Sequence, residues 1–371
     1  MPLYLNDDQN MLRDTARDFM AAEGAIPKEL RHWRDKGCGD GFGHALWKQF
    51  AEMGFTGILI DEADGGLGLG HVEVGIVLEE IGRNLTPSPF LVSAVAFVEA
   101  LKGTALRERW YPGILSGDTV AALAIDEGAK HRPEAITMRA ERSGNGFKLS
   151  GRKQFVVQGA SADVTLVAAR TDDGLTLFAV EKDARGLEVE GVRLADASIG
   201  ARLTFGDVEV DADAVVGEVG GGEKVLARAL RAGRTGAAAE LVGVGSASMD
   251  MTVDYLKQRK QFGRLIGEFQ ALQFRAAHLY SELEIARAAT LKAQQLLDEG
   301  SDEAETMVSV AKAKAGRAAQ LAVQEGVQMH GGIGMTDEYD IGLYMKRDRV
   351  LNELFGDPAF HADRLARMKG Y

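Results

Sequence analysis

The stretch Arg259-Lys260-Gln261-Phe262-Gly263 separates two long helical patterns in the C-terminal part of the chain. Before it, from about Glu223 to Gln258, small and apolar residues recur in steps of three and four, which is typical of a helix with a packing face. After it, sequence rich in Ala and Leu and poor in proline continues to the C-terminus and contains a second distinctive stretch, Gln328-Met329-His330-Gly331-Gly332. Taken singly, Gly263 is only a possible helix C-cap and Arg259 only a surface charge. Their combination with the second stretch, in this order, is more specific than either alone.

Upstream of these helices the periodicity changes twice. Residues 5–115 follow a helical pattern, with Asn6 or Asp7 as the first cap and Met11, Ala16, Phe19 and Met20 near helical spacing. Between about residues 119 and 218 apolar residues alternate, and Asn145-Gly146 and Asp173-Gly174 favour tight hairpins. We therefore predict an α+β chain with a helical domain at 1–117, an antiparallel β domain at 118–222 and a helical bundle at 223–371.

Composition limits the classes of function. The chain has 371 residues, 46% of them hydrophobic, and a net charge of -12, which suits a protein with large buried cores and gives no basic surface for nucleic acid. One cysteine, Cys38, suits a reducing compartment. No apolar run approaches the roughly 20 residues of a membrane span, and no signal peptide is visible, so we expect a cytoplasmic protein.

Two further patterns are weaker than they look. The glycines of the stretch 65–70 follow an apolar run, but the third glycine of a dinucleotide-binding motif would fall at His71, and no βαβ alternation follows. We interpret this stretch as a structural loop. The seven histidines show no paired ligand spacing, so no metal site is expected.

The stretches at 259–263 and 328–336 resemble the acyl-CoA dehydrogenase family, and the resemblance covers essentially the whole chain. It implies an acyl-CoA dehydrogenase-like fold, FAD as cofactor and a tetrameric assembly. In the family the arginine of an Arg-Lys-x-Phe-Gly turn approaches the FAD pyrophosphate across the subunit interface, and other residues of the partner's half complete the contact. The residues of this chain that match these positions are Arg259, Gln261, Phe262, Gln270, Gln328, Gly331 and Gly332.

The β-domain half of the flavin site departs from the family pattern. Ile125 and Asp126 stand before Glu127 where the family has a threonine before its glutamate, followed by a Gly-x-Gly-Ser turn. Phe155 and Val157 stand where a tryptophan and a threonine usually cover the flavin and bond to its N5 edge. The resemblance implies that these four residues contact the cofactor through backbone amides and packing. The alternative for Phe155 is a residue of the strand core.

The catalytic base is missing from its usual place. The family's glutamate falls in a Glu-Gly-Thr run, and here the segment is Leu351-Asn352-Glu353-Leu354-Phe355-Gly356-Asp357-Pro358. In an isovaleryl-type branch the base precedes the helix arginine that matches Arg234, where this chain has Gly233.

Glu240 is the leading replacement for the base. It lies on the same helix face as Gly233, in a stripe of small residues. Such a stripe either packs against another helix or leaves a slot for a ligand. An unpaired glutamate at a tight helix contact would be costly, which favours a catalytic carboxylate. Asp357 is the second candidate; it is shorter by a methylene and lies one position after the usual site, which Gly356 occupies here. Glu353 is the third.

The resemblance implies α,β-dehydrogenation of an acyl-CoA thioester, with electrons passing to an electron-transfer flavoprotein. The absence of both usual bases is similar to bacterial enzymes that act on bulky or steroid-type acyl groups, often as α2β2 heterotetramers. A homotetramer is the other assembly. The alternative function is a non-catalytic partner subunit that completes the FAD site of an active chain. An acyl-CoA oxidase is less favoured, because oxidases of this kind usually have a longer C-terminal region.

Overall fold

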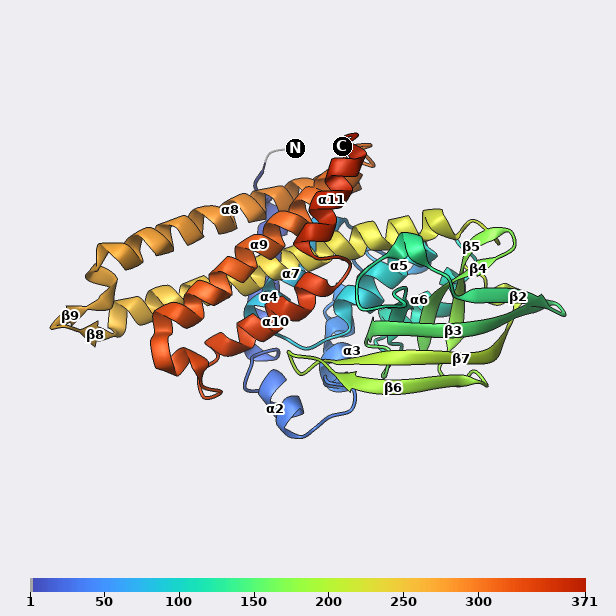
Figure 1. Cartoon of the computed structure of the whole chain (residues 1–371), viewed down its shortest axis with the longest axis horizontal. Helices are drawn as coiled ribbons and strands as arrows, with labels where there is room; N and C mark the ends of the chain where they lie inside the picture. The colour runs from blue at the N-terminus through green and yellow to red at the C-terminus, as the bar shows by residue number, and fades with distance from the viewer. Residues whose placement is uncertain (1–2) are drawn as a thin grey trace. The chain divides into compact units, whose positions relative to one another are not determined.

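The computed structural model describes residues 3–371, which form two compact units. One unit combines the chain up to Arg31 with residues 71–86 and 234–371, and the other combines residues 32–70 with 87–233. The predicted order of helices, sheet and helices is confirmed (Figure 1). The exact boundaries of the three predicted domains stay a prediction.

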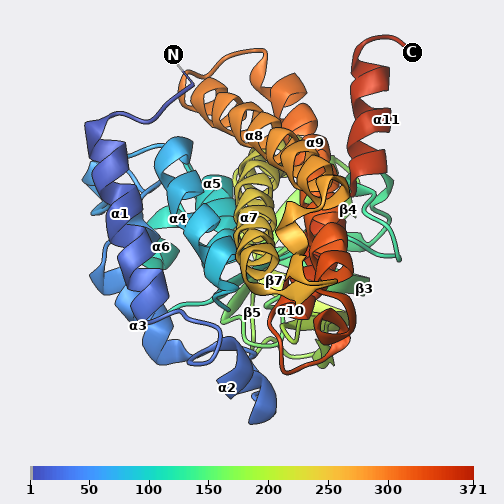
Figure 2. The same cartoon turned by 90° about the vertical axis from the view of Figure 1, so that its left-hand side faces the viewer.

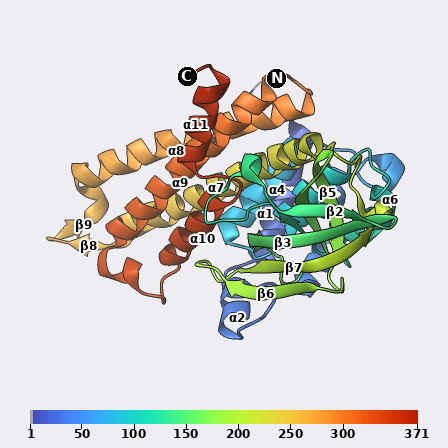
Figure 3. The same ribbon diagram turned by 45° about the vertical axis from the view of Figure 1, so that its right-hand side comes forward.

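The second unit is built around a seven-stranded sheet, in which β1, β4, β2, β3, β7 and β6 are neighbours in this order and β5 pairs with β4. Most pairs are antiparallel, and Figure 3 shows β2, β3, β7 and β6 side by side. The prediction of an antiparallel domain is wrong for strand β4, which pairs in parallel with β1 and, at Arg139 and Arg170, with β2. The strands are β1 (Ala121–Ala124), β2 (Arg139–Ser143), β3 (Gly146–Val157), β4 (Val164–Thr171), β5 (Gly174–Glu181), β6 (Leu187–Arg193) and β7 (Ile199–Asp211).

Both predicted hairpins exist, with each turn one residue earlier than expected. Ser143 pairs with Gly146, so the β2–β3 turn is made by Gly144 and Asn145. Gly146 itself begins β3, where a Cβ would lie 2.0 Å from the carbonyl oxygen of Val210 in β7. The glycine is therefore required by the close approach of a neighbouring strand and not by the turn.

The core of this unit lies against the sheet and includes Phe147 and Phe178, whose rings meet edge to face at 5.2 Å. The short helices of the unit precede the sheet in sequence. A buried π-helical segment, Leu91–Phe97, continues directly into one of them, the helix that begins at Val98. The helices are α3 (His44–Glu52), α5 (Val98–Leu101) and α6 (Arg107–Leu115). Helix α2 (Leu30–Asp35) begins in the other unit.

The first unit is helical. Helix α1 (Asp7–Ala22) begins with a capping box in which Asn6 and Gln9 exchange hydrogen bonds, and α1 packs along α4 (His71–Asn84) (Figure 2). Of the expected α1 face, Ala16 and Met20 are buried but Met11 is exposed. The predicted helix before residue 259 is α7 (Gly222–Gln258), of which the part from Arg234 on belongs to this unit. A short hairpin of β8 (Lys260–Gln261) and β9 (Arg264–Leu265) follows it, and then come α8 (Gln270–Asp298), α9 (Ala304–His330), α10 (Ile341–Glu353) and α11 (Pro358–Met368).

None of the helices among residues 3–371 is long and apolar enough to cross a membrane.

Candidate functional site

The first predicted binding stretch forms the hairpin at the tip of α7 and α8 (Figure 1). Phe262 and Gly263 both have positive φ, 54° and 80°, as the two central residues of a tight two-residue turn require. The Phe262 side chain is 93% exposed. Arg259 is also exposed, and within residues 3–371 its side chain makes no hydrogen bond or ion pair. The Arg259 guanidinium is therefore available to a partner outside the described part of the chain.

The second predicted stretch lies at the end of α9, close to the C-terminal part of α7. The ring of His330 stacks on Tyr255 of α7 at 4.4 Å and contacts Tyr339 at 4.9 Å. Gln328, Gly331 and Gly332 are exposed beside this aromatic cluster. The structure therefore brings this stretch and the turn of Arg259 to one end of the helical unit, as expected for residues that serve one ligand. Gln270, the first residue of α8, is exposed as well.

In the sheet unit, Ile125 and Asp126 lie in a loop that is tied to β3. The Ile125 carbonyl oxygen accepts a hydrogen bond from Lys153 Nζ at 3.0 Å, and the Asp126 carbonyl oxygen accepts one from the Gln154 amide at 2.8 Å. The Asp126 carboxylate also accepts from His131 Nδ1 and from the Arg132 amide. Asp126 therefore serves as an internal anchor of the loop.

Glu127 and Lys153 form the second anchor of this loop. Burial works against the ionised Glu127, but hydrogen bonds from Thr137, Lys153 and Met138 outweigh it and lower the pKa of Glu127 to about 2. Lys153 is fully buried and lies 2.9 Å from Glu127. Sequence reasoning did not identify this pair as the support of the loop. A cavity of about 320 Å³ lies beside it, lined by residues that include Ile125, Glu127, Lys130 and Ile136.

Phe155 occupies an irregular point of β3. Its φ is +53°, in the left-handed region that bulky residues rarely adopt, and the register with β7 shifts between Lys153 and Val156. Its side chain is half-buried, whereas Val157 is buried. Both interpretations of Phe155, as a flavin contact and as a residue of the strand core, stay predictions. Backbone strain of this kind concentrates at functional sites.

Glu240 is nearly fully buried in the middle of α7. Arg347 of α10 donates two hydrogen bonds to Glu240 Oε1, from Nε at 2.8 Å and from Nη2 at 2.5 Å. The premise that this carboxylate is unpaired is therefore wrong. A partner for a buried glutamate could have been expected, because buried charges are usually paired, but no local pattern identifies Arg347.

The small-residue stripe around Glu240 packs against α4. A Cβ on Gly82 of α4 would lie 2.2 Å from the Glu240 carbonyl oxygen, and one on Gly243 would lie 2.0 Å from the Glu79 carbonyl oxygen. Of the two alternatives for the stripe, these contacts favour helix packing.

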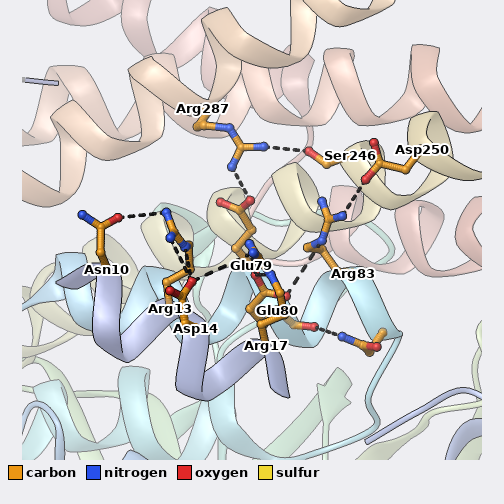
Figure 4. A network of polar contacts seen from close by, with 11 residues as sticks. Asn10, Arg13, Asp14, Arg17, Glu79, Glu80, Arg83, Ser246, Asp250 and Arg287 are labelled. Atoms are coloured by element: carbon orange, nitrogen blue, oxygen red, sulfur yellow. Dashed lines mark hydrogen bonds and ion pairs between the residues drawn. The ribbon is translucent and has the colours of Figure 1, made fainter. Parts of the chain in front are cut away.

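Ion pairs hold the same contact together at its rim (Figure 4). Arg287 of α8 donates hydrogen bonds to Glu79 of α4 and to Ser246 of α7. Arg83 of α4 forms an ion pair with Asp250 of α7, with 2.5 Å between Nη2 and Oδ2. Glu80 is buried beside them, and burial raises its pKa against the opposing effect of Arg17 and Arg83. The α4–α7 contact is thus fixed by both shape and charge.

Asp357 and Glu353 have structural partners. Asp357 is the N-cap of α11, and its carboxylate accepts a hydrogen bond from the Phe360 amide at 2.8 Å. Glu353, the last residue of α10, pairs with Arg349 at 3.0 Å. Neither observation assigns a catalytic role to these carboxylates, which stay candidates.

The turn between α10 and α11 is connected to two other helices. Arg234 Nε donates to the Phe355 carbonyl oxygen at 3.2 Å. Lys312 of α9, fully buried, donates to the carbonyl oxygens of Leu351, Asn352 and Gly356. Sequence analysis did not single out Lys312, because a lysine in an Ala-rich helix usually faces solvent.

Comparison with family models matches most of the chain in three consecutive parts. The acyl-CoA dehydrogenase N-terminal domain matches residues 6–118, the middle domain residues 123–211 and the C-terminal domain residues 220–369.

Individual relatives agree with this match. The chain is 32% identical to mitochondrial isovaleryl-CoA dehydrogenase of Solanum tuberosum over 83% of this chain and 78% of the relative. It is 30% identical to cyclohex-1-ene-1-carbonyl-CoA dehydrogenase of Geobacter metallireducens over 95% of each chain. Among solved structures, a variant of the Tcur3481-Tcur3483 steroid ACAD is similar with a TM-score of 0.90 at 29% identity, over 98% of both chains.

Proposed function

The chain belongs to the acyl-CoA dehydrogenase family, and on this premise we propose that it catalyses the FAD-dependent α,β-dehydrogenation of an acyl-CoA thioester to the 2-enoyl-CoA. The observation that carries the proposal is the match of all three family domains along one chain. The two halves expected to contact the cofactor are each formed within their own unit. Their geometry supports the proposal as described below.

The described residues fit a flavin dinucleotide in two ways. Arg259, exposed and with no side-chain partner among residues 3–371, offers a charge-assisted contact to a phosphate group. Phe155, half-buried at a strained bulge, offers an aromatic face beside a firmly anchored loop. The residues that would contact the cofactor of a neighbouring subunit are Arg259, Gln261, Phe262, Gln270, Gln328, Gly331 and Gly332. Those that would contact the cofactor of their own subunit are Ile125, Asp126, Phe155 and Val157. When bound, the flavin supplies the hydride acceptor.

Glu240 is the proposed base for the α-proton. It is buried on α7, six residues after Arg234, and six helical residues span about 9 Å. Arg347 holds the carboxylate in place through its two hydrogen bonds. Accepting a proton would end this ion pair, so the assignment requires a direct test. Asp357 is the competing candidate.

The substrate and partners are proposed from the relatives. Their names include branched, cyclic and steroid-type substrates, and we infer that the acyl group here is branched or bulky. An electron-transfer flavoprotein is the proposed electron acceptor. The proposed assembly is a homotetramer or an α2β2 heterotetramer in the cytoplasm.

A second function is favoured by one observation. Glu240 is engaged by Arg347, and Asp357 is engaged as a helix cap. A chain in which both carboxylates serve structure would act as a non-catalytic subunit that completes the FAD site of an active partner. The two functions differ in whether this chain reduces flavin by itself.

The test is anaerobic reduction of the bound flavin by a panel of acyl-CoA thioesters, including branched-chain and steroid side-chain esters. Glu240→Gln should retain the fold and the flavin absorbance but lose a factor of about 10² to 10⁴ in the rate of bleaching, the usual cost of losing a general base. Asp357→Asn is the matched control and should bleach much faster than Glu240→Gln. If Asp357→Asn is the slow variant, the base lies in the α10–α11 turn.

A parent protein that does not bleach with any thioester, but supports bleaching when co-purified with a related chain, establishes the non-catalytic function.

A further inference from the structure

The turn between α10 and α11 has an unusual backbone. Phe355 has a φ of +60° and Gly356 one of +105°. The first value is rare for a bulky residue, and the second is in the region that favours glycine. Asp357, the next residue, is the N-cap of α11, so the backbone conformation is constrained on this side of the turn as well. Something outside the turn must hold it in this conformation.

Three buried side chains supply that support. Lys312, fully buried, donates to the carbonyl oxygens of Leu351 at 2.9 Å, Asn352 at 3.3 Å and Gly356 at 3.1 Å. Arg234 Nε and His361 Nε2 both lie 3.2 Å from the Phe355 carbonyl oxygen. The donors come from three different helices, α9, α7 and α11. Carbonyl groups that α10 leaves unsatisfied at its end are thus fixed from three sides.

The conformation brings Gly356 against the ring of Phe360. A Cβ on Gly356 would lie 2.3 Å from Cδ1 of that ring, 2.9 Å from Cε1 and 3.0 Å from Cγ. The Phe360 ring is half-buried, with the Arg234 guanidinium over it at 5.5 Å and the His361 ring edge to face with it at 5.1 Å, so these two groups limit its movement on two sides. A side chain at position 356 therefore requires movement of Phe360 or of the whole turn.

We propose that the ring of Phe360 against Gly356 forms a steric lock, which Lys312 holds in position. Gly356 occupies the position that matches the usual catalytic glutamate of the family, and the lock excludes any acidic side chain from that position. Phe360 is a specificity-determining residue in this scheme, since it puts an aromatic ring where a carboxylate would otherwise start. Lys312 is a positioning residue. The catalytic consequence is that the base comes from elsewhere in the chain, and this part rests on the proposed function. The steric relation between Gly356 and Phe360 is independent of the proposed function.

The steric relation is tested by a double-mutant cycle on the full-length protein. Gly356→Ala should lower the midpoint of thermal unfolding in the parent. In a Phe360→Ala background the same substitution should lower the midpoint less, by a difference of at least about 3 °C, because contacting residues are coupled. Equal decreases in both backgrounds overturn the lock. The cycle is then repeated in Lys312→Met, where the coupling should disappear, and in Lys314→Met as control, because Lys314 pairs with Glu282 instead of the turn. Coupling that persists in Lys312→Met overturns the role of Lys312.

The catalytic consequence is tested in a Glu240→Gln background. Gly356→Glu alone should not restore flavin bleaching by acyl-CoA, whereas Gly356→Glu together with Phe360→Ala should raise it at least tenfold. Restoration by Gly356→Glu alone overturns the lock. Coupling in the thermal cycle without restoration in the combined variant leaves the lock in place and counts against the proposed function.

Discussion

Two regions of the helical unit treat their charged residues in opposite ways. At the outer end, the Arg259 side chain is exposed and makes no ion pair within residues 3–371. At the contact of α7, α9 and α10, Glu240 and Lys312 are buried, and each has partners from another helix. The first arrangement leaves binding capacity for a group outside the chain. In the second arrangement the charged groups are bound to other parts of the fold, so a substitution there should first reduce the free energy of unfolding.

The largest expected effect is at the buried contact. Arg347→Met should remove two hydrogen bonds to the buried Glu240 carboxylate and destabilise the protein by about 3 kcal/mol, because breaking one side of a buried ion pair leaves its charge less well compensated. Arg259→Met is the matched control, and its free energy of unfolding should change by less than about 0.5 kcal/mol. Urea denaturation of the apo-proteins gives both values. Equal destabilisation by the two substitutions would remove the distinction between the regions.

The next effect is at the outer end and concerns binding. Arg259→Ala should weaken FAD retention by at least about tenfold, since a charge-assisted hydrogen bond contributes about 1.5–3 kcal/mol. Phe155→Ala removes packing alone and should have a smaller effect. The measurement is flavin per subunit after gel filtration at several dilutions. If both variants retain FAD equally, the cofactor has been assigned to the wrong residues.

The smallest effect sharpens the description of the buried contact through pH. Burial raises the pKa of Asp348 to about 7, although Lys312, Arg349 and Asn352 oppose the shift. A carboxyl group whose pKa is higher in the folded than in the unfolded state stabilises the fold fully below its unfolded pKa of about 4. That contribution is lost as the pH rises through about 7.

Asp348→Asn should therefore reduce the fall in stability between pH 4.5 and pH 7. Asp363→Asn is the control, because Asp363 is an exposed residue paired with Arg367. Urea midpoints across this range provide the comparison. A slope in Asp348→Asn equal to that of the parent would contradict the assignment.

The sequence alone predicted features that depend on neighbouring residues. The helix of α7 was predicted to within one residue, since small and apolar side chains at helical spacing specify both the helix and its packing face. The hairpins were displaced by one residue because the glycine in each pair was needed at a strand start. The stretches at 259–263 and 328–332 indicated the family because they are short, specific and in a defined order.

Only the tertiary structure decided which charges are paired and which space is filled. Arg347 and Glu240 are separated by 107 positions, and Lys312 lies 44 positions from Gly356. No local pattern predicts such contacts, because they depend on how α7, α9 and α10 cross. Glycine at 356 showed that the usual carboxylate is absent, but the ring of Phe360 against it became evident only when the turn was formed. Periodicity determines a helix through residues three and four positions apart, whereas a buried ion pair or a steric contact exists only after distant segments have packed together.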